Sequence, residues 1–180
     1  MITKKQVLLG RDAASVLMEK ACVAMSMQER DDMEVTDFGL ENYPAEGAQI
    51  ITFINTQKVC FRAICLMEGQ ILPEHTHTAC LGEEGKEESF RVVYGNLRLF
   101  VPGKTAGAVS CVPKDKEAFY TCRKEILMRS PQQVTLKADT PHWLMGGEGG
   151  CVVYTVSSWA RDALDPFTNP NVVRQAIISD

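Results

Sequence analysis

The sequence predicts an all-β fold, an antiparallel sandwich or barrel, whose only helices lie in an N-terminal extension. From residue 48 onward, short runs rich in β-branched and aromatic residues follow one another and are bounded by turn residues. No helical pattern separates these runs, as it would in a parallel α/β sheet. The 180 residues, with 45% apolar and 23% charged side chains, have the composition of one globular domain.

The first segment, residues 1–33, is expected to be helical. Capping-box patterns occur at 3–6 and 26–29, where a Thr or Ser is followed three positions later by Gln or Glu. Between them an apolar stripe recurs at i, i+3, i+4 and i+7, formed by Ala14, Leu17, Met18 and Ala21. We therefore expect an amphipathic helical extension that covers one face or end of the β-domain.

The β-region is expected over residues 48–160, followed by a C-terminal tail at 161–180, and the whole chain, 1–180, should be a single domain. The expected strands cover residues 50–54, 59–67, 90–94, 97–101, 134–136 and 151–156. Gly95-Asn96 separates two apolar runs and predicts a two-residue hairpin turn, since both positions of such a turn need positive φ. An antiparallel domain has edge strands that tend to pair or be covered, so we expect a homodimer.

Bulk properties exclude several classes of partner. The net charge of -4 offers no basic stripe for nucleic acid. No apolar run is long enough for a membrane span. The stretch after Met1 is a polar-interrupted helical pattern rather than a signal peptide, which predicts a cytoplasmic protein. The seven cysteines, an odd number without a C-x-x-C pair, are expected to be reduced.

The histidines predict a metal site. The chain has only three, His75 and His77 in an H-x-H pair and His142 in the triplet Pro141-His142-Trp143. Positions i and i+2 of a strand point to the same side, so the pair offers two imidazoles to one ion. Glu88, just before the run 90–94, adds a carboxylate. Four such ligands leave two open positions on a six-coordinate divalent cation, the arrangement of a Lewis-acid site.

These residues also carry a resemblance. Gly69-x5-His75-x-His77, then Glu88 and Gly95, resembles the first motif of the cupin superfamily, with a longer gap than usual before the Glu. The stretch ending at His142 is similar to the second motif but lacks its P-x-G. The resemblance is sharper to the D-lyxose isomerase family of small cupins, in the segments 73–77, 85–91, 94–95, 139–143 and 156–170. It implies a cupin-type double-stranded antiparallel β-barrel (jelly roll).

The resemblance further implies a metal-dependent aldose–ketose isomerase that interconverts D-lyxose and D-xylulose, or D-mannose and D-fructose, through an enediolate. Mn²⁺ is the favoured ion, and Fe²⁺, Zn²⁺ and Co²⁺ stay open because the same ligands suit them. No Gly-rich phosphate loop or arginine cluster indicates phosphorylated substrates, so free sugars are expected. The sequence does not choose between the sugar epimers.

Roles follow for the remaining site residues. Lys86 has the same parity as Glu88 and should face the same side, as an acid or an oxygen-positioning group. Glu88 is expected to act as base besides binding the metal. The expected substrate-binding residues are Lys86, Trp143, Asp165 and Phe167. In the family a carboxylate often lies two residues before the Ser157-Ser158 pair, but here that position is Thr155, which leaves the identity of the base open.

Two other functions remain open on the sequence alone. A ferrous-iron dioxygenase would use the same three imidazoles and carboxylate. A non-catalytic sugar-binding cupin would explain the missing carboxylate at Thr155. Oxygen uptake would identify the first, and sugar binding without conversion would identify the second.

Overall fold

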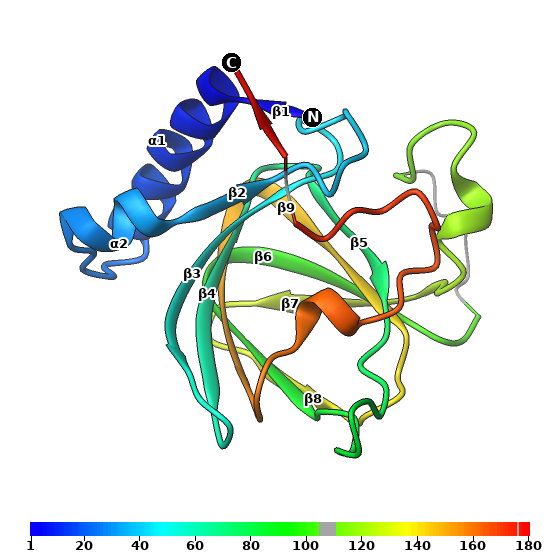
Figure 1. Cartoon of the computed structure of the whole chain (residues 1–180). Helices are drawn as coiled ribbons and strands as arrows, with labels where there is room; N and C mark the ends of the chain where they lie inside the picture. Colours follow the sequence, from blue (N-terminus) through cyan, green and yellow to red (C-terminus); the bar gives the residue numbers. More distant parts are fainter. Residues whose placement is uncertain (105–110, 176) are drawn as a thin grey trace.

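Eight strands of the computed structural model, which describes residues 1–104, 111–175 and 177–180, form one antiparallel sheet that curls around a common interior (Figure 1). The strand order is β2-β3-β4-β9-β6-β7, with β5 also pairing with β9 and β8 with β6. The strands are β2 (Glu34–Thr36), β3 (Ala48–Asn55), β4 (Cys60–Leu66), β5 (Ile71–His75), β6 (Glu88–Val101), β7 (Lys124–Arg129), β8 (Gln133–Leu136) and β9 (His142–Ser157). The predicted all-β, cupin-type fold is confirmed.

The two longest strands, β6 and β9, hold the barrel together. The start of β9 pairs with β5 and its later part pairs with β4, while β6 runs beside it along most of its length. β6 in turn pairs with β8 through its first residues and with β7 through its last. Each long strand therefore belongs to both sides of the barrel.

The hairpin predicted at Gly95-Asn96 is wrong, because β6 continues through it as one strand. The pairing with β9 shifts register between Gly95 and Leu97, so the glycine marks a bulge instead of a turn. Gly95 has φ +72°, and a Cβ there would lie 2.1 Å from the Gly150 carbonyl oxygen. A turn and a bulge both call for positive φ at glycine, and local sequence does not distinguish them.

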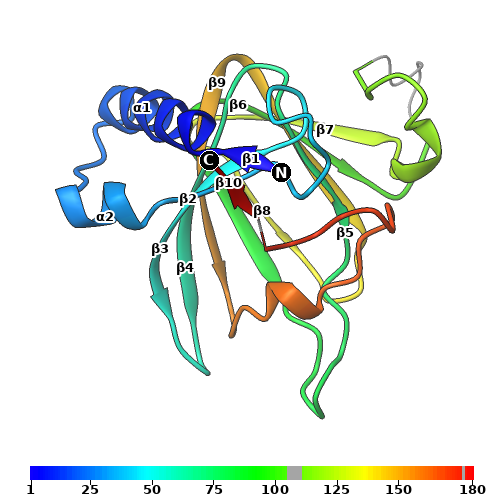
Figure 2. The same cartoon turned by 45° about the horizontal axis from the view of Figure 1, so that its top comes forward.

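The N-terminal extension holds α1 (Lys4–Lys20) and α2 (Met27–Asp32), which lie against the outside of the barrel (Figure 2). Both predicted capping boxes form, at Thr3 and at Ser26. The short strands β1 (Ile2–Thr3) and β10 (Ile178–Ser179) pair in parallel, so the two ends of the chain lie side by side.

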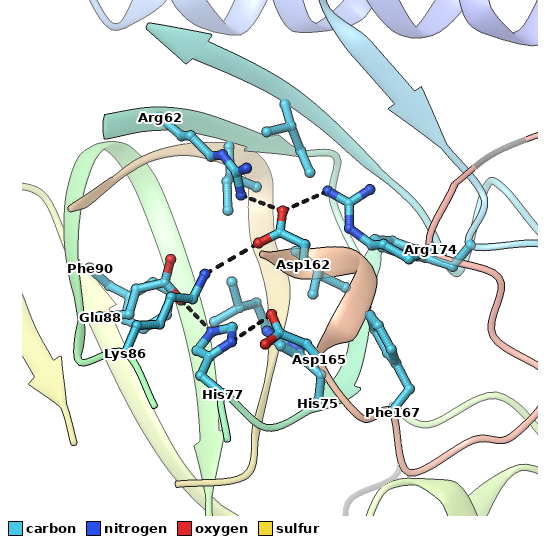
Figure 3. Close-up of a pocket in the computed structure, with 15 residues that line it drawn as sticks. Arg62, His75, His77, Lys86, Glu88, Phe90, Asp162, Asp165, Phe167 and Arg174 are labelled. Carbon is cyan, nitrogen blue, oxygen red and sulfur yellow. Dashed lines mark hydrogen bonds and ion pairs between the residues drawn. The ribbon is translucent and has the colours of Figure 1, made fainter. Parts of the chain in front are cut away.

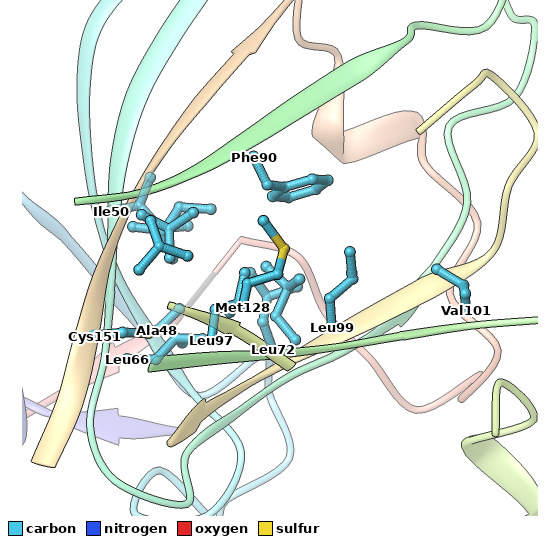
Figure 4. Packing of buried hydrophobic residues seen from close by; sticks show 14 of the residues in the cluster. Ala48, Ile50, Leu66, Leu72, Phe90, Leu97, Leu99, Val101, Met128 and Cys151 are labelled. Atoms are coloured by element: carbon cyan, nitrogen blue, oxygen red, sulfur yellow. The ribbon is translucent and has the colours of Figure 1, made fainter. Parts of the chain in front are cut away.

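Side chains that alternate along the strands belong to two different apolar clusters, one on each face of the sheet. Inside the barrel, Ile50, Ile64 and Val153 belong to the main cluster, part of which Figure 4 shows around Phe90 and Met128. The neighbouring residues on the same strands, Ile51, Ala63 and Val152, face outward and pack against the helical stripe Ala14, Leu17 and Met18. Period-two alternation thus buries both faces of this part of the sheet.

After β9 the chain crosses one end of the barrel. It passes through the 3₁₀ helix η2 (Asp162–Leu164) to Phe167, which forms a β-bridge with His75. The Thr76 amide donates to the Pro166 carbonyl, and the Thr168 amide donates to the Glu74 carbonyl. A second 3₁₀ helix, η1 (Glu117–Phe119), lies before β7.

All seven cysteines lie in the described part of the chain, and each is free. No helix within the described ranges combines the length and the apolar character needed to cross a bilayer.

Candidate metal centre

The four expected ligands come together at one point inside the barrel. One ligand atom from each of His75, His77, Glu88 and His142 lies within 4.8 Å of the others, and all four residues are buried. His75 ends β5 and is the cross-strand partner of His142, the first residue of β9. Glu88 begins β6. His77 lies just beyond β5 instead of on it, so the two imidazoles do not converge through strand alternation as expected.

Backbone carbonyls fix the orientation of two of the imidazoles. His75 Nδ1 is 2.9 Å from the Pro73 carbonyl oxygen, and His142 Nδ1 is 2.9 Å from the Thr140 carbonyl oxygen. A carbonyl only accepts, so each Nδ1 carries the proton and each Nε2 presents a lone pair to the cluster. Among the described residues, His142 Nε2 is buried without any hydrogen-bond partner.

His77 lies between two carboxylates. Its Nδ1 is 2.8 Å from Asp165 Oδ2, and its Nε2 is 2.8 Å from Glu88 Oε2. Burial alone would lower the pKa of His77, but the hydrogen bonds with Asp165 and Glu88 outweigh it and raise the pKa. Both ring nitrogens of His77 therefore face a carboxylate oxygen, and a cation held by His77 and Glu88 would take the place of a proton between these two residues.

The other two imidazoles are kept neutral. Burial lowers the pKa of His75 well below its ordinary value, and burial lowers the pKa of His142 to about 4. The pKa of Glu88 is also lowered, since Lys86 and His77 outweigh the opposing effect of burial. Neutral imidazoles and an ionised carboxylate are the forms that bind divalent cations. Together with the orphaned Nε2 of His142, they show that this donor set fits such an ion.

A cavity opens beside the ligands, and three of the other expected site residues, Lys86, Asp165 and Phe167, line it (Figure 3). The Phe167 ring lies 5.4 Å from the His75 ring, centroid to centroid. Lys86 is buried, as expected from its parity with Glu88, and its Nζ donates to Asp162 Oδ1 at 3.3 Å. Apolar side chains, including Ile64 and Phe90, form the inner wall.

Two positions that the sequence analysis singled out, Trp143 and Thr155, do not line the cavity. Trp143 is fully buried and stacks on Phe100, with ring centroids 3.7 Å apart, and its Nε1 donates to the Cys122 carbonyl at 3.0 Å. It points away from the cavity because neighbouring strand residues face opposite sides, and His142 takes the inner side. Thr155 is buried opposite Phe90 on the ladder and is not among the residues that line the cavity.

The far side of the cavity holds a charged group that the sequence analysis did not predict. Asp162 on η2 accepts from Arg62 at 2.5 Å, from Arg174 at 3.0 Å and from Lys86 at 3.3 Å. Burial alone would raise the pKa of Asp162, but Lys86, Arg62 and Arg174 outweigh it and lower the pKa well below its ordinary value. Arg62 and Arg174 therefore lie near one another, although the sequence shows no arginine cluster. Both guanidiniums have carboxylate partners, as Arg174 also pairs with Glu34.

One sequence signal could have indicated this group. Arg62 on β4 has the parity of Ile64, which faces the barrel interior, and a charged residue at an inward position needs a buried partner. Asp162 and Arg174 come from the tail, where no periodicity links them to β4. Their association depends on how the tail crosses the barrel.

Comparison with known proteins finds relatives that match the chain by sequence over nearly its whole length. No protein-family model matches the chain. The chain is 39% identical to the D-lyxose ketol-isomerase of Cohnella laeviribosi, over 94% of this chain and 93% of that protein. It is 37% identical to the D-lyxose ketol-isomerase of a Thermofilum species, over 97% of both chains. It is 35% identical to the D-lyxose/D-mannose isomerase of Thermosediminibacter oceani, over 100% of both.

Solved structures of low sequence identity share the fold. The L-ribose isomerase of Acinetobacter sp. DL28, in complex with L-ribose, superposes with a TM-score of 0.82 at 15% identity, covering 99% of this chain and 98% of that chain. The L-ribose isomerase of Cellulomonas parahominis gives 0.81 at 14% identity with the same coverage. At such identities the likeness concerns the fold and leaves the substrate to be argued from the site.

Proposed function

The chain belongs to the D-lyxose ketol-isomerase family, and from this premise we propose that it is a divalent-metal-dependent isomerase that interconverts free D-lyxose with D-xylulose and D-mannose with D-fructose. The observation that carries the proposal is the buried group of His75, His77, Glu88 and His142, whose ligand atoms lie within 4.8 Å of one another. The names of the relatives, two D-lyxose ketol-isomerases and one D-lyxose/D-mannose isomerase, support the choice of substrates.

These four residues would hold the ion. A divalent cation bound there would supply Lewis-acid stabilisation for the negative charge that develops on the sugar oxygens. We favour Mn²⁺, with Fe²⁺, Zn²⁺ and Co²⁺ as ions that the same donors accept. The carbonyls of Pro73 and Thr140 keep His75 and His142 in the tautomer that ligation needs.

Lys86 is the proposed donor to a sugar oxygen. It is buried beside Glu88, and its Nζ, which has several hydrogen-bond donors, uses one of them on Asp162. Phe167 and Asp165 form the tail side of the substrate site. The empty space of the cavity, with the open space at its mouth included, is about 420 Å³, which is within the range of small-molecule sites.

A homodimer and a cytoplasmic location complete the proposal. The partly exposed rings of Phe53, Phe61 and Tyr154 contact one another on the outer side of the barrel, and an apolar surface of this kind supports pairing with a second copy. The seven free cysteines support a reducing compartment. Light scattering of the purified protein tests the first expectation, since a monomer at micromolar concentration contradicts it.

The function is tested by metal analysis and a sugar panel. The purified protein is stripped with a chelator and reloaded separately with manganese, iron, zinc and cobalt. It is then assayed for ketose with free D-lyxose, D-mannose, L-ribose and D-xylose. We expect ketose from D-lyxose and D-mannose, strict dependence on metal, and the same rate without oxygen. Sugar binding without ketose would indicate a binding protein, and oxygen uptake during turnover would indicate an oxygenase.

A further inference from the structure

An aldose–ketose isomerisation that proceeds through an enediolate needs a base beside C1 and C2 of the sugar. The strand position where a carboxylate was expected holds Thr155, which does not line the cavity. We propose that Asp165 is the general base, an inference that rests on the proposed function.

The other charged groups in the cavity wall are committed to other roles. His75, His77 and Glu88 belong to the ligand group, so their lone pairs go to the cation. A carboxylate that binds a metal is a weakened base, which argues against the base role expected for Glu88. Three groups are cationic: Arg62, Lys86 and Arg174. Asp162 faces all three of these cations, at 2.5, 3.3 and 3.0 Å respectively, and its oxygens are occupied by them.

Asp165 differs from Asp162 because only one of its oxygens is engaged. Oδ2 accepts from His77 Nδ1 at 2.8 Å, and Oδ1 has no partner among the described residues. The side chain is 9% exposed and lies in the cavity wall between His77 and Phe167 (Figure 3). The bond from the Thr76 amide to the Pro166 carbonyl fixes the adjacent backbone. The carboxylate is therefore anchored on one side, with a free oxygen beside the ligand group.

The proposed step balances in protons and electrons. Asp165 Oδ1 takes the proton from C2 of the aldose, the pair of the broken C–H bond forms the C1–C2 double bond, and the carbonyl pair moves onto O1. The O2 proton passes to O1, while Lys86 donates a hydrogen bond to these oxygens. Asp165 then returns its proton to C1 as the carbonyl forms at C2, and it ends as a carboxylate.

A second role for Asp165 has to be separated from this one. A carboxylate that accepts from the far nitrogen of a ligating histidine also orients that ligand, and its loss commonly weakens metal binding by about 10–100-fold. Asp165→Asn keeps an acceptor oxygen for His77 and removes the base. Asp165→Ala removes both. Asp12→Asn, at an exposed side chain of α1, is the matched control for the change of charge.

The test uses the full chain loaded with manganese and has three measurements. The first is kcat for D-lyxose. The second is manganese affinity by competition with a chelator. The third is calorimetric binding of the alditol obtained by reducing D-lyxose, which cannot isomerise. For Asp165→Asn we expect kcat to fall by about 1,000-fold, with manganese and alditol binding unchanged. Asp165→Ala should lose both kcat and manganese affinity, and Asp12→Asn should match the wild type.

Several outcomes overturn the inference. Asp165→Asn protein that keeps more than about a tenth of kcat shows that no base was removed. A loss of manganese affinity that accounts for its lost activity reduces Asp165 to a residue that positions His77. If the asparagine variant does not fold, Asp165→Ser takes its place with the same criteria. Wild-type protein that forms no ketose removes the proposed function and this inference together.

Discussion

The cavity has two ends, a metal end formed by His75, His77, Glu88 and His142 and a charged end formed by Asp162 with Arg62, Lys86 and Arg174. The polar groups of the two ends differ in whether they have hydrogen-bond or ion-pair partners. At the metal end, His142 Nε2 is buried without a partner, and His77 Nε2 faces Glu88 Oε2, an arrangement that needs a proton or a cation between them. At the charged end, Asp162 accepts from Arg62, Lys86 and Arg174, and Arg174 also pairs with Glu34.

This difference shows which end could hold an external ion. A buried polar atom without a partner is costly, so the unpaired His142 Nε2 fits a bound cation at the metal end. The charged end is complete by itself, and its ion pairs serve to hold η2 and the tail over the barrel. Unpaired polar atoms therefore indicate the end of this cavity that could bind an ion. The number of charged side chains would indicate the other end.

The largest effect should come from removing the orphaned ligand. His142→Ala leaves three donors, and we expect manganese binding at micromolar concentration to be lost. We expect kcat/KM for D-lyxose to fall by more than about 1,000-fold, equivalent to about 4 kcal/mol of transition-state stabilisation. Metal content of the purified variant and initial rates of ketose formation measure both. Normal metal content together with normal rate would show that the orphaned nitrogen is not a ligand.

A change at the charged end should act on stability. Asp162→Asn leaves Arg62, Lys86 and Arg174 without their shared carboxylate. Removing one partner from a buried ion pair costs about 3–5 kcal/mol in the free energy of unfolding, measured by urea denaturation. Glu125→Gln, which breaks the more exposed pair with Arg98, is the control and should cost less than about 1 kcal/mol. Equal losses in the two variants would contradict a specific role for the buried network.

The same variant has a defined pH dependence. Because the three cations hold the pKa of Asp162 below that of the unfolded chain, the stabilisation is fully present above the unfolded pKa of about 4. It is lost as the pH falls toward the folded pKa. The difference in unfolding free energy between wild type and Asp162→Asn should therefore shrink as the pH is lowered below about 4.

Manganese should stabilise the protein through the metal end alone. At a free concentration 100 times Kd, binding only to the folded state adds about 2.7 kcal/mol to the free energy of unfolding. We expect this increment in wild type and in Asp162→Asn, and no increment in His142→Ala. Thermal unfolding with and without manganese measures it. An increment in His142→Ala as large as in wild type would mean that the ion binds elsewhere.

The sequence predicted that the four residues of the metal end would come together, and of the charged end it predicted only Lys86. The metal end was predictable because the three histidines lie in two short motifs and because Glu88 follows His75 and His77 closely along the chain. Arg62, Asp162 and Arg174 come from β4, η2 and the tail, and no spacing along the chain brings them together. β7 was missed because its solvent-facing charges, such as Lys124 and Arg129, obscure the apolar positions. Gly95 was misassigned to a turn because a bulge needs the same backbone conformation.

The smallest expected effect concerns Trp143, which the sequence offered as a sugar-binding residue and the structure buries against Phe100. Trp143→Phe keeps an aromatic ring and removes the Nε1 donor, so the Cys122 carbonyl loses its partner. We expect a loss of about 1.5 kcal/mol in unfolding free energy, the cost of an unpaired buried acceptor. KM for D-lyxose and manganese content should stay unchanged, because the indole contacts neither end of the cavity. A higher KM with unchanged stability would return Trp143 to the sugar site and extend the functional part of the cavity beyond the metal end.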